Sequence, residues 1–252
     1  MVTTPVVASG APEPPASGPI NHFARLIGVF FSPTATFQGI AAQPSWLVPV
    51  ILMTVLGIVT AFVMNQKVDW RDVASKRIEE SPRAANLTPE QKEQQLAMSA
   101  KVSPYVAYVF GTLGPVLAVV IVAGVLLLAY NVISGANAKF GQAMGIVSHA
   151  MIVGLIGTVF LILILFLKPP GTIDLENPVA TNIGAFLPDS TPKALMALAK
   201  SIDIFSIWTL LLIAIGFAAV NPKKLQGKSL GIALSVWAVY VACKMGFAWI
   251  FS

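Results

Sequence analysis

Five long stretches of apolar residues limit what this chain can fold into. They span residues 46–64, 105–133, 146–167, 202–220 and 230–251. Each holds at least about 18 residues with almost no charge, and a helix of that length crosses a hydrocarbon core roughly 30 Å thick. The sequence therefore predicts an all-α integral membrane protein, a bundle of five transmembrane helices.

Composition supports this prediction and excludes several functions. The 252 residues are 56% hydrophobic and 11% charged, with a mean hydropathy of +0.79, which lies outside the range of soluble domains. The net charge of +5 is spread over loops and forms no basic patch interleaved with aromatic residues, so nucleic acid is not an expected partner. The one cysteine, Cys243, excludes a disulfide within the chain and a thiolate metal cluster.

Three parts are expected before the first span. Residues 1–19 are rich in Pro, Ala, Ser and Gly and lack a basic start, which predicts a disordered tail. From Ile20 to Phe31, apolar residues recur at helical spacing, with His22 and Arg25 off the apolar face. Ser32 and the proline after it suit the N-cap and first position of a second short helix. We expect these short helices to lie at the bilayer surface.

The one long polar segment, residues 65–103, follows the first span. Its composition predicts a helix over about Trp70 to Glu80. Thr88 and Gln91 have the spacing of a capping box, so a second helix is expected to begin there. Pro104 is expected to end that helix before the second span begins. The segment is thus predicted to be a helical hairpin outside the membrane.

His149 is the one histidine inside a predicted span, and it shares a helix face with Gly141 and Gly145. Small residues allow a neighbouring helix to approach closely, and an imidazole there hydrogen-bonds across the interface. The alternative is a proton relay, because ionisable groups inside membranes often mark pathways. No acidic residue lies at mid-depth in a predicted span to serve as the second group of a relay, so packing is the preferred interpretation.

Lys244 lies inside the last predicted span, about eight residues from its end. One face of that helix is aromatic and the opposite face is made of small residues, which places Lys244 towards lipid or towards a loosely packed interface with another helix. Its ammonium is expected to extend to the nearby interface. Two alternatives remain open. One is an ion pair with Asp203, which antiparallel fourth and fifth spans would bring near the same surface, and the other is a role in binding an ion or substrate.

Asp203 and Trp208 are expected to hold the fourth span at one depth. A carboxylate at a helix N-terminus is stabilised by the unpaired N–H groups and the helix dipole there. Trp208 follows five residues later, within reach of the interface, where its ring packs and its N–H finds a polar partner. The functional alternative is that Asp203 binds a cation or a proton.

The sequence shows no constellation of residues that is typical of an enzyme. It has no HExxH metal site, no intramembrane pair of Asp or His, no nucleophile elbow and no Cys/His set. We therefore expect neither catalysis nor a cofactor nor a bound metal. The leading hypothesis is a non-enzymatic membrane protein that organises protein partners or lipid packing. A small transporter or channel subunit using His149, Asp203, Asn131 and Lys244 is the alternative, and an intramembrane enzyme comes third.

Three short motifs follow one another in a recognisable order. They are FSPTATF at Phe31–Phe37, KFGQA at Lys139–Ala143 leading to His149–Ala150, and DIFSIW at Asp203–Trp208 ahead of Gly216. With five spans and a polar hairpin after the first, this order resembles the Yip family, first named for interacting with Ypt/Rab GTPases. The resemblance covers about Asn21 to Ser252.

This resemblance implies a five-span helical bundle with a cytosolic N-terminus, and in eukaryotic members a role in vesicle traffic and membrane shape. The short tail of this chain differs from the long partner-binding tails of eukaryotic members, which argues against binding of a Rab-type GTPase. The hairpin and loops resemble those of bacterial members, so the expected location is the bacterial cytoplasmic (inner) membrane. The expected partners are the lipid bilayer and either other membrane proteins or further copies of this chain.

The distribution of positive charge conflicts with that sidedness. With the N-terminus inside, the cytoplasmic side holds Arg25, Lys139, Lys223, Lys224 and Lys228. The opposite side then holds Lys67, Arg71, Lys76, Arg77, Arg83, Lys92, Lys101, Lys168, Lys193 and Lys200. A plain count of Lys and Arg favours an external N-terminus. Because the acids except Glu13 also lie on the second side, and the hairpin can translocate as a folded unit, we expect a cytoplasmic N-terminus and a periplasmic C-terminus.

Overall fold

The computed structural model describes residues 21–79, 81, 86–169, 175, 177–188 and 190–250. Its helices are α1 (His22–Phe31), α2 (Pro33–Ala42), α3 (Leu47–Lys67), α4 (Trp70–Glu79), α5 (Pro89–Ser134), α6 (Phe140–Met151), α7 (Gly154–Leu167), η2 (Ile183–Phe186), α8 (Lys193–Ser201), α9 (Ile204–Val220), α10 (Pro222–Leu225) and α11 (Ser229–Ile250). Every regular element among the described residues is a helix, which confirms the all-α prediction. The predicted disordered tail, residues 1–19, lies outside the described part.

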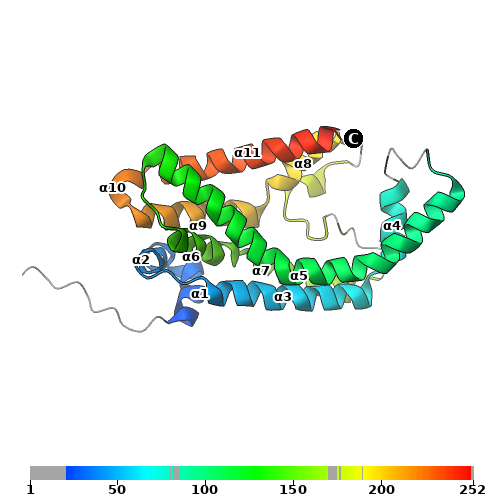
Figure 1. Ribbon diagram of the computed structural model, residues 1–252, viewed down its shortest axis with the longest axis horizontal. Coiled ribbons are helices and arrows are strands. Elements are labelled where there is room, and N and C mark those ends of the chain that lie inside the picture. Colours follow the sequence, from blue (N-terminus) through cyan, green and yellow to red (C-terminus); the bar gives the residue numbers. More distant parts are fainter. Residues whose placement is uncertain are drawn as a thin grey trace, which may run out of the picture.

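Figure 1 shows an elongated bundle whose long helices run along its longest axis. Helices α1, α2 and α10 lie at one end, and α4 and the C-terminus lie at the other. Four helical segments are long and apolar enough to cross a membrane, namely α3, α5, the α6–α7 pair and α11. Helix α9, which contains the predicted fourth span, is apolar but has only 17 residues. The structure thus supports a multi-pass membrane protein, while the predicted count of five spans is not confirmed.

Helix α5 corrects the prediction that Pro104 ends a helix. The capping box is present as expected: Thr88 accepts from Gln91 N at 3.2 Å, and Gln91 Oε1 accepts from Thr88 N at 2.9 Å. From there, however, one helix of 46 residues continues through Pro104 and Pro115 into the second span. A proline removes one backbone donor, a loss that a long helix packed against a neighbour tolerates. Helix α5 packs along α3, which provides that support.

The predicted third span is interrupted. It begins earlier than expected, at Phe140, and α6 ends at Met151 before α7 starts at Gly154. At the junction, Ile152 N donates to His149 O and Val153 N donates to Ala150 O, both at 3.4 Å. These are i→i−3 bonds, which tighten the turn and redirect the helix. The interruption therefore lies directly after His149.

Helix α6 forms the centre of the bundle. Residues 143–150 are all buried, because α2, α5 and α9 each pack against this helix. Small residues make this possible: a Cβ added to Gly145 would lie 2.9 Å from Ile40 Cγ2 of α2. On α9, a Cβ added to Gly216 would clash with Ile146 of α6 and lie 2.9 Å from Phe37 Cδ1 of α2. Close helix approach at small residues is how membrane helices gain packing contacts.

The two predicted N-terminal helices are present, and both pack on the bundle. Asn21 caps α1 through its side chain, which accepts from Ala24 N at 2.9 Å. Helix α2 begins with Pro33 at its first position, as predicted, although the Ser32 side chain makes no capping bond. Phe37 and Ile40 of α2 are completely buried. These helices are therefore part of the core, and their placement at a bilayer surface remains a prediction.

Candidate functional site

His149 lies in the middle of the core and is completely buried. Its Nδ1 is 2.8 Å from the carbonyl oxygen of Gly145, one turn earlier in α6. A carbonyl oxygen only accepts, so Nδ1 carries the proton and Nε2 is left with a lone pair. Among the described residues, no group hydrogen-bonds to that Nε2. The imidazole is thus fixed at one nitrogen and unpartnered at the other.

Arg25 of α1 binds the C-terminal end of α2. Its Nη1 donates to Gln43 O at 2.8 Å and to Ser45 Oγ at 2.6 Å, and its Nη2 donates to Gly39 O at 3.0 Å. The last carbonyls of a helix have no partner within the helix and lie at the negative end of its dipole. A guanidinium there donates hydrogen bonds to those carbonyls and places a positive charge at that end of the dipole. Burial lowers the pKa of Arg25 from its ordinary value.

These groups form one junction, which we call the α1–α2–α6 junction and define by His22, Arg25, Gln142 and His149. Gln142 of α6 donates to Ala41 O of α2 at 2.7 Å. His22 and Arg25 are both close enough to His149 to interact with it electrostatically, and His22 Nδ1 is also buried without a partner among the described residues. The hydrogen bonds of Arg25, Gln142 and His149 go to backbone carbonyls and to Ser45. The junction therefore holds α1, α2 and α6 together, and it contains two imidazole nitrogens, His22 Nδ1 and His149 Nε2, that have no hydrogen-bond partner among the described residues.

Asp203 is the N-cap of α9, as the sequence indicated. Its Oδ1 accepts from Phe205 N at 2.9 Å and from Ser206 N at 3.0 Å. Its Oδ2 accepts from the hydroxyl of Thr181. Beside it, Ile204 N donates to Thr181 O at 3.2 Å, so the loop before η2 is tied to the start of α9. The carboxylate is fully engaged in local hydrogen bonds.

Lys244 binds a neighbouring helix through a serine. Its Nζ is 3.1 Å from Ser201 Oγ, at the end of α8, and α8 packs against α11. The structure has no ion pair between Lys244 and Asp203, so that alternative is not borne out. The lysine is half-buried where α8 packs against α11.

Trp208 contacts the N-terminal region of the chain. Its ring meets that of Phe30 in α1 edge-to-face, with centroids 5.7 Å apart. The four predicted residues thus do not form one site. His149 lies in the α1–α2–α6 junction, Trp208 packs against α1, and Asp203 and Lys244 lie near the α8–α9 connection. Their common property is that each holds two elements together or fixes a turn of helix.

A second polar link, which was not predicted from the sequence, joins α5, α9 and α11. Tyr130 is buried, and its hydroxyl donates to Ser229 O at 2.7 Å, while Ser229 Oγ donates to Ala214 O at 2.6 Å. The Tyr130 ring stacks on Phe217 with centroids 4.0 Å apart. A tyrosine within an apolar stretch was the available signal, since a buried hydroxyl needs a partner.

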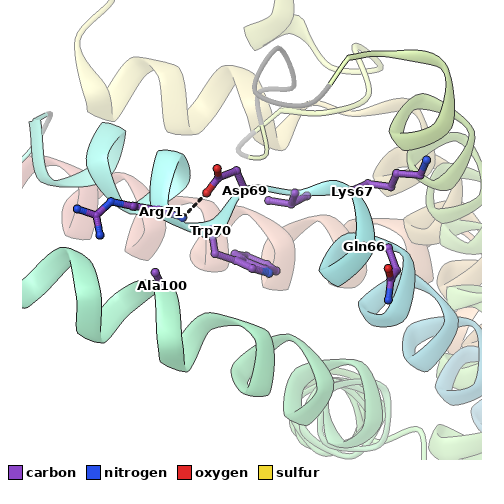
Figure 2. Close-up of a pocket in the computed structure, with 7 residues that line it drawn as sticks. Gln66, Lys67, Asp69, Trp70, Arg71 and Ala100 are labelled. Atoms are coloured by element: carbon purple, nitrogen blue, oxygen red, sulfur yellow. Dashed lines mark hydrogen bonds between the residues drawn. The ribbon is translucent and has the colours of Figure 1, made fainter.

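A third polar link joins α3, α4 and α5 outside the core, and Figure 2 shows Trp70 there between the α3–α4 connection and α5. Trp70 Nε1 donates to Asn65 Oδ1 at 2.9 Å, and Asn65 Nδ2 donates to Pro104 O at 3.3 Å. Arg71 pairs with Glu93 of α5 at 2.7 Å. The hydrogen bond that Arg71 donates to Glu93 raises the pKa of Arg71, but both side chains are more than half exposed, so the pair adds little stability.

The fold and these contacts define the class: a multi-pass α-helical membrane protein whose polar side chains mostly bind backbone groups of neighbouring helices. The sequence model of the Yip1 domain matches residues 27–249, which is most of the chain. The chain belongs to the Yip1 domain family, as the resemblance predicted. A search of curated proteins and a search of solved structures each found no match.

The structure explains why three separate motifs point to one family. Phe37 of the first motif, Ile146 just after the second, and Gly216 just after the third meet where α2, α6 and α9 pack. Trp208 of the third motif contacts α1 immediately before the first motif. Residues in or after the three motifs thus pack together where α2, α6 and α9 meet, although they lie far apart in sequence.

Proposed function

We propose that this Yip1-family protein is a non-enzymatic organiser of membrane partners or lipid packing, in the bacterial cytoplasmic membrane. The observation that supports this proposal most is that its charged side chains form hydrogen bonds within the fold. The carboxylate of Asp203, the guanidinium of Arg25 and the ammonium of Lys244 all bind groups of the fold itself. Among the described residues, no three His, Cys, Asp or Glu side chains gather at a place that could hold a metal ion.

An apolar stripe on α1 supports an interaction with lipid. Phe23, Ile27 and Phe31 lie one turn apart on the same face, and their exposed fractions are 71%, 45% and 82%. The opposite face of α1 holds buried Val29 and the inward-turned Arg25. An amphipathic helix of this kind buries its apolar face at the boundary of headgroups and acyl chains. Interfacial placement of α1, with α9 as a fifth span, is part of the proposal.

A small transporter remains the second candidate, because His149 Nε2 and His22 Nδ1 are buried without partners in the described part of the chain. A flux assay in proteoliposomes decides between the two functions. If the protein is a non-enzymatic organiser, we expect no saturable ion or solute flux above that of empty vesicles. A saturable flux that His149→Ala or Asp203→Asn abolishes would make the protein a transporter. A pull-down from native lipid then identifies the partners, among which a Rab-type GTPase is not expected.

Topology gives a prediction of its own. A cytoplasmic N-terminus and five spans place the α9–α11 connection inside and the C-terminus in the periplasm. A reporter that is active only in the periplasm is therefore expected to be active after Ser252 and inactive when inserted at Gly227, an exposed turn position with φ of +77°. A reporter active only in the cytoplasm is the control and should give the reverse. The opposite pattern would support the Lys/Arg count instead.

A further inference from the structure

A groove of about 1050 Å³ runs between α4 and α5 and continues along α3 to α7. Helix α3 packs against both α5 and α7, and α4 packs against the N-terminal part of α5. The groove therefore extends from the polar hairpin into the apolar length of the spans. Its volume lies just above that of typical small-molecule sites, which enclose about 300–1,000 Å³.

The groove has two chemical zones. Its deep end is lined by side chains of the apolar spans, among them Ala61, Phe110 and Leu161. Its mouth, between the two helices of the hairpin, is lined by Arg77 and Gln95 together with the apolar Ala74, Ile78 and Met98. Arg77 is the one charged group among the described residues that line the groove. Arg77 is exposed, whereas Arg71 on the same helix is paired with Glu93.

Trp70 separates the two zones. Its hydrogen bond to Asn65 fixes its ring at the wall of the groove, near the end of α3. Tryptophan at this level is typical of the boundary between hydrocarbon and headgroups. This lining favours an occupant that is apolar along the spans and carries a negative charge beside Arg77. A phospholipid combines apolar acyl chains with a charged headgroup, and in a bilayer phospholipids surround the apolar spans.

We infer that the groove binds one phospholipid with an anionic headgroup, an acyl chain lying along Ala61, Phe110 and Leu161 and the phosphate region against Arg77. This inference rests on the proposed function, because it names the lipid that an organiser of lipid packing holds. The occupant is a lipid and not a peptide, since the deep zone opens within the spans while the mouth offers a single cation. The exposed fraction of Phe110, 70%, shows that the deep zone is open from the side.

Native mass spectrometry of the purified protein, loaded with phosphatidylglycerol or phosphatidylcholine, tests the inference. The parent protein is expected to retain one phosphatidylglycerol in preference to phosphatidylcholine. Arg77→Gln should lower retention of phosphatidylglycerol about five-fold, the equivalent of about 1 kcal/mol for one cation at an anionic lipid. Lys101→Gln is the matched control, because Lys101 is exposed on α5 at the same end and does not line the groove. It should leave retention unchanged.

A filling variant tests the deep zone separately. Ala107 lines the groove, and Ala107→Trp should remove retention of both lipids while Arg77→Lys keeps most of it. Melting curves of each variant show that it is folded. Equal retention of both lipids, or equal losses in Arg77→Gln and Lys101→Gln, would overturn the inference. The flux assay and the pull-down use neither Arg77 nor Ala107, so the proposed function stands or fails separately.

Discussion

Gly57→Ala is expected to destabilise the protein strongly, because it forces α3 away from α5. The two helices cross at Gly57 and Gly111 with their backbones in contact: a Cβ on Gly111 would lie 2.6 Å from the carbonyl oxygen of Gly57, and a Cβ on Gly57 would clash with that of Gly111. The obstructing atoms are backbone, so no rotamer change relieves them. Overpacking of this kind costs about 1–3 kcal/mol, and we expect the melting temperature in detergent to fall by roughly 4–10 °C.

Gly124→Ala is the matched control for this experiment. Gly124 lies on the same helix, α5, and nothing lies within 4 Å of an added Cβ there. Alanine is preferred over glycine in a helix interior by about 0.5–1 kcal/mol, so this variant should melt at or slightly above the temperature of the parent protein. Should Gly57→Ala and Gly124→Ala melt together, the close crossing of α3 and α5 does not limit stability.

Arg25→Ala is expected to release α1 and α2 from the bundle. The change leaves the carbonyls of Gly39 and Gln43 and the hydroxyl of Ser45 without their cationic donor. Hydrogen bonds to a charged group contribute about 1.5–3 kcal/mol to stability. We expect a lower melting temperature and new protease cleavage between α2 and α3, within residues 43–46. Both are measurable on the purified protein.

Arg25→Lys distinguishes the contribution of the positive charge at position 25 from that of the guanidinium's hydrogen-bond geometry. Lysine keeps a cation near the C-terminal end of α2, but its single ammonium does not reproduce the fork that spans three acceptors. Its stability should therefore lie between those of the parent protein and Arg25→Ala. If Arg25→Ala keeps the cleavage pattern and the melting curve of the parent, then burial of Phe37 and Ile40 alone holds α2 in place.

Features encoded in neighbouring residues could be predicted from the sequence. Apolar stretches located the long helices, the spacing of Thr88 and Gln91 predicted the start of α5, and the position of Asp203 before an apolar run predicted an N-cap. Each depends on contacts within about one helical turn. Interactions between residues a few positions apart determine these features, so a short window of the sequence is enough to predict them.

Features that depend on distant segments could not be predicted in this way. Arg25 was placed off the apolar face of a surface helix, yet it turns inward because the carbonyls of α2 lie beside it. Pro104 breaks an isolated helix more readily than one packed along α3. Lys244 donates to Ser201, while the Asp203 carboxylate accepts from Thr181 of a distant loop. Where several partners compete, only the assembled fold decides among them.

The continuous course of α5 connects the two ends of the molecule mechanically. Its 46 residues form about 69 Å of continuous helix, which bends along its length (Figure 1). Helix α4 packs on its N-terminal half, and Tyr130 near its last turn is bonded to Ser229 of α11. Because one backbone runs from α4 to α11, we expect a displacement of the polar hairpin to reach the α10–α11 region through the protein itself.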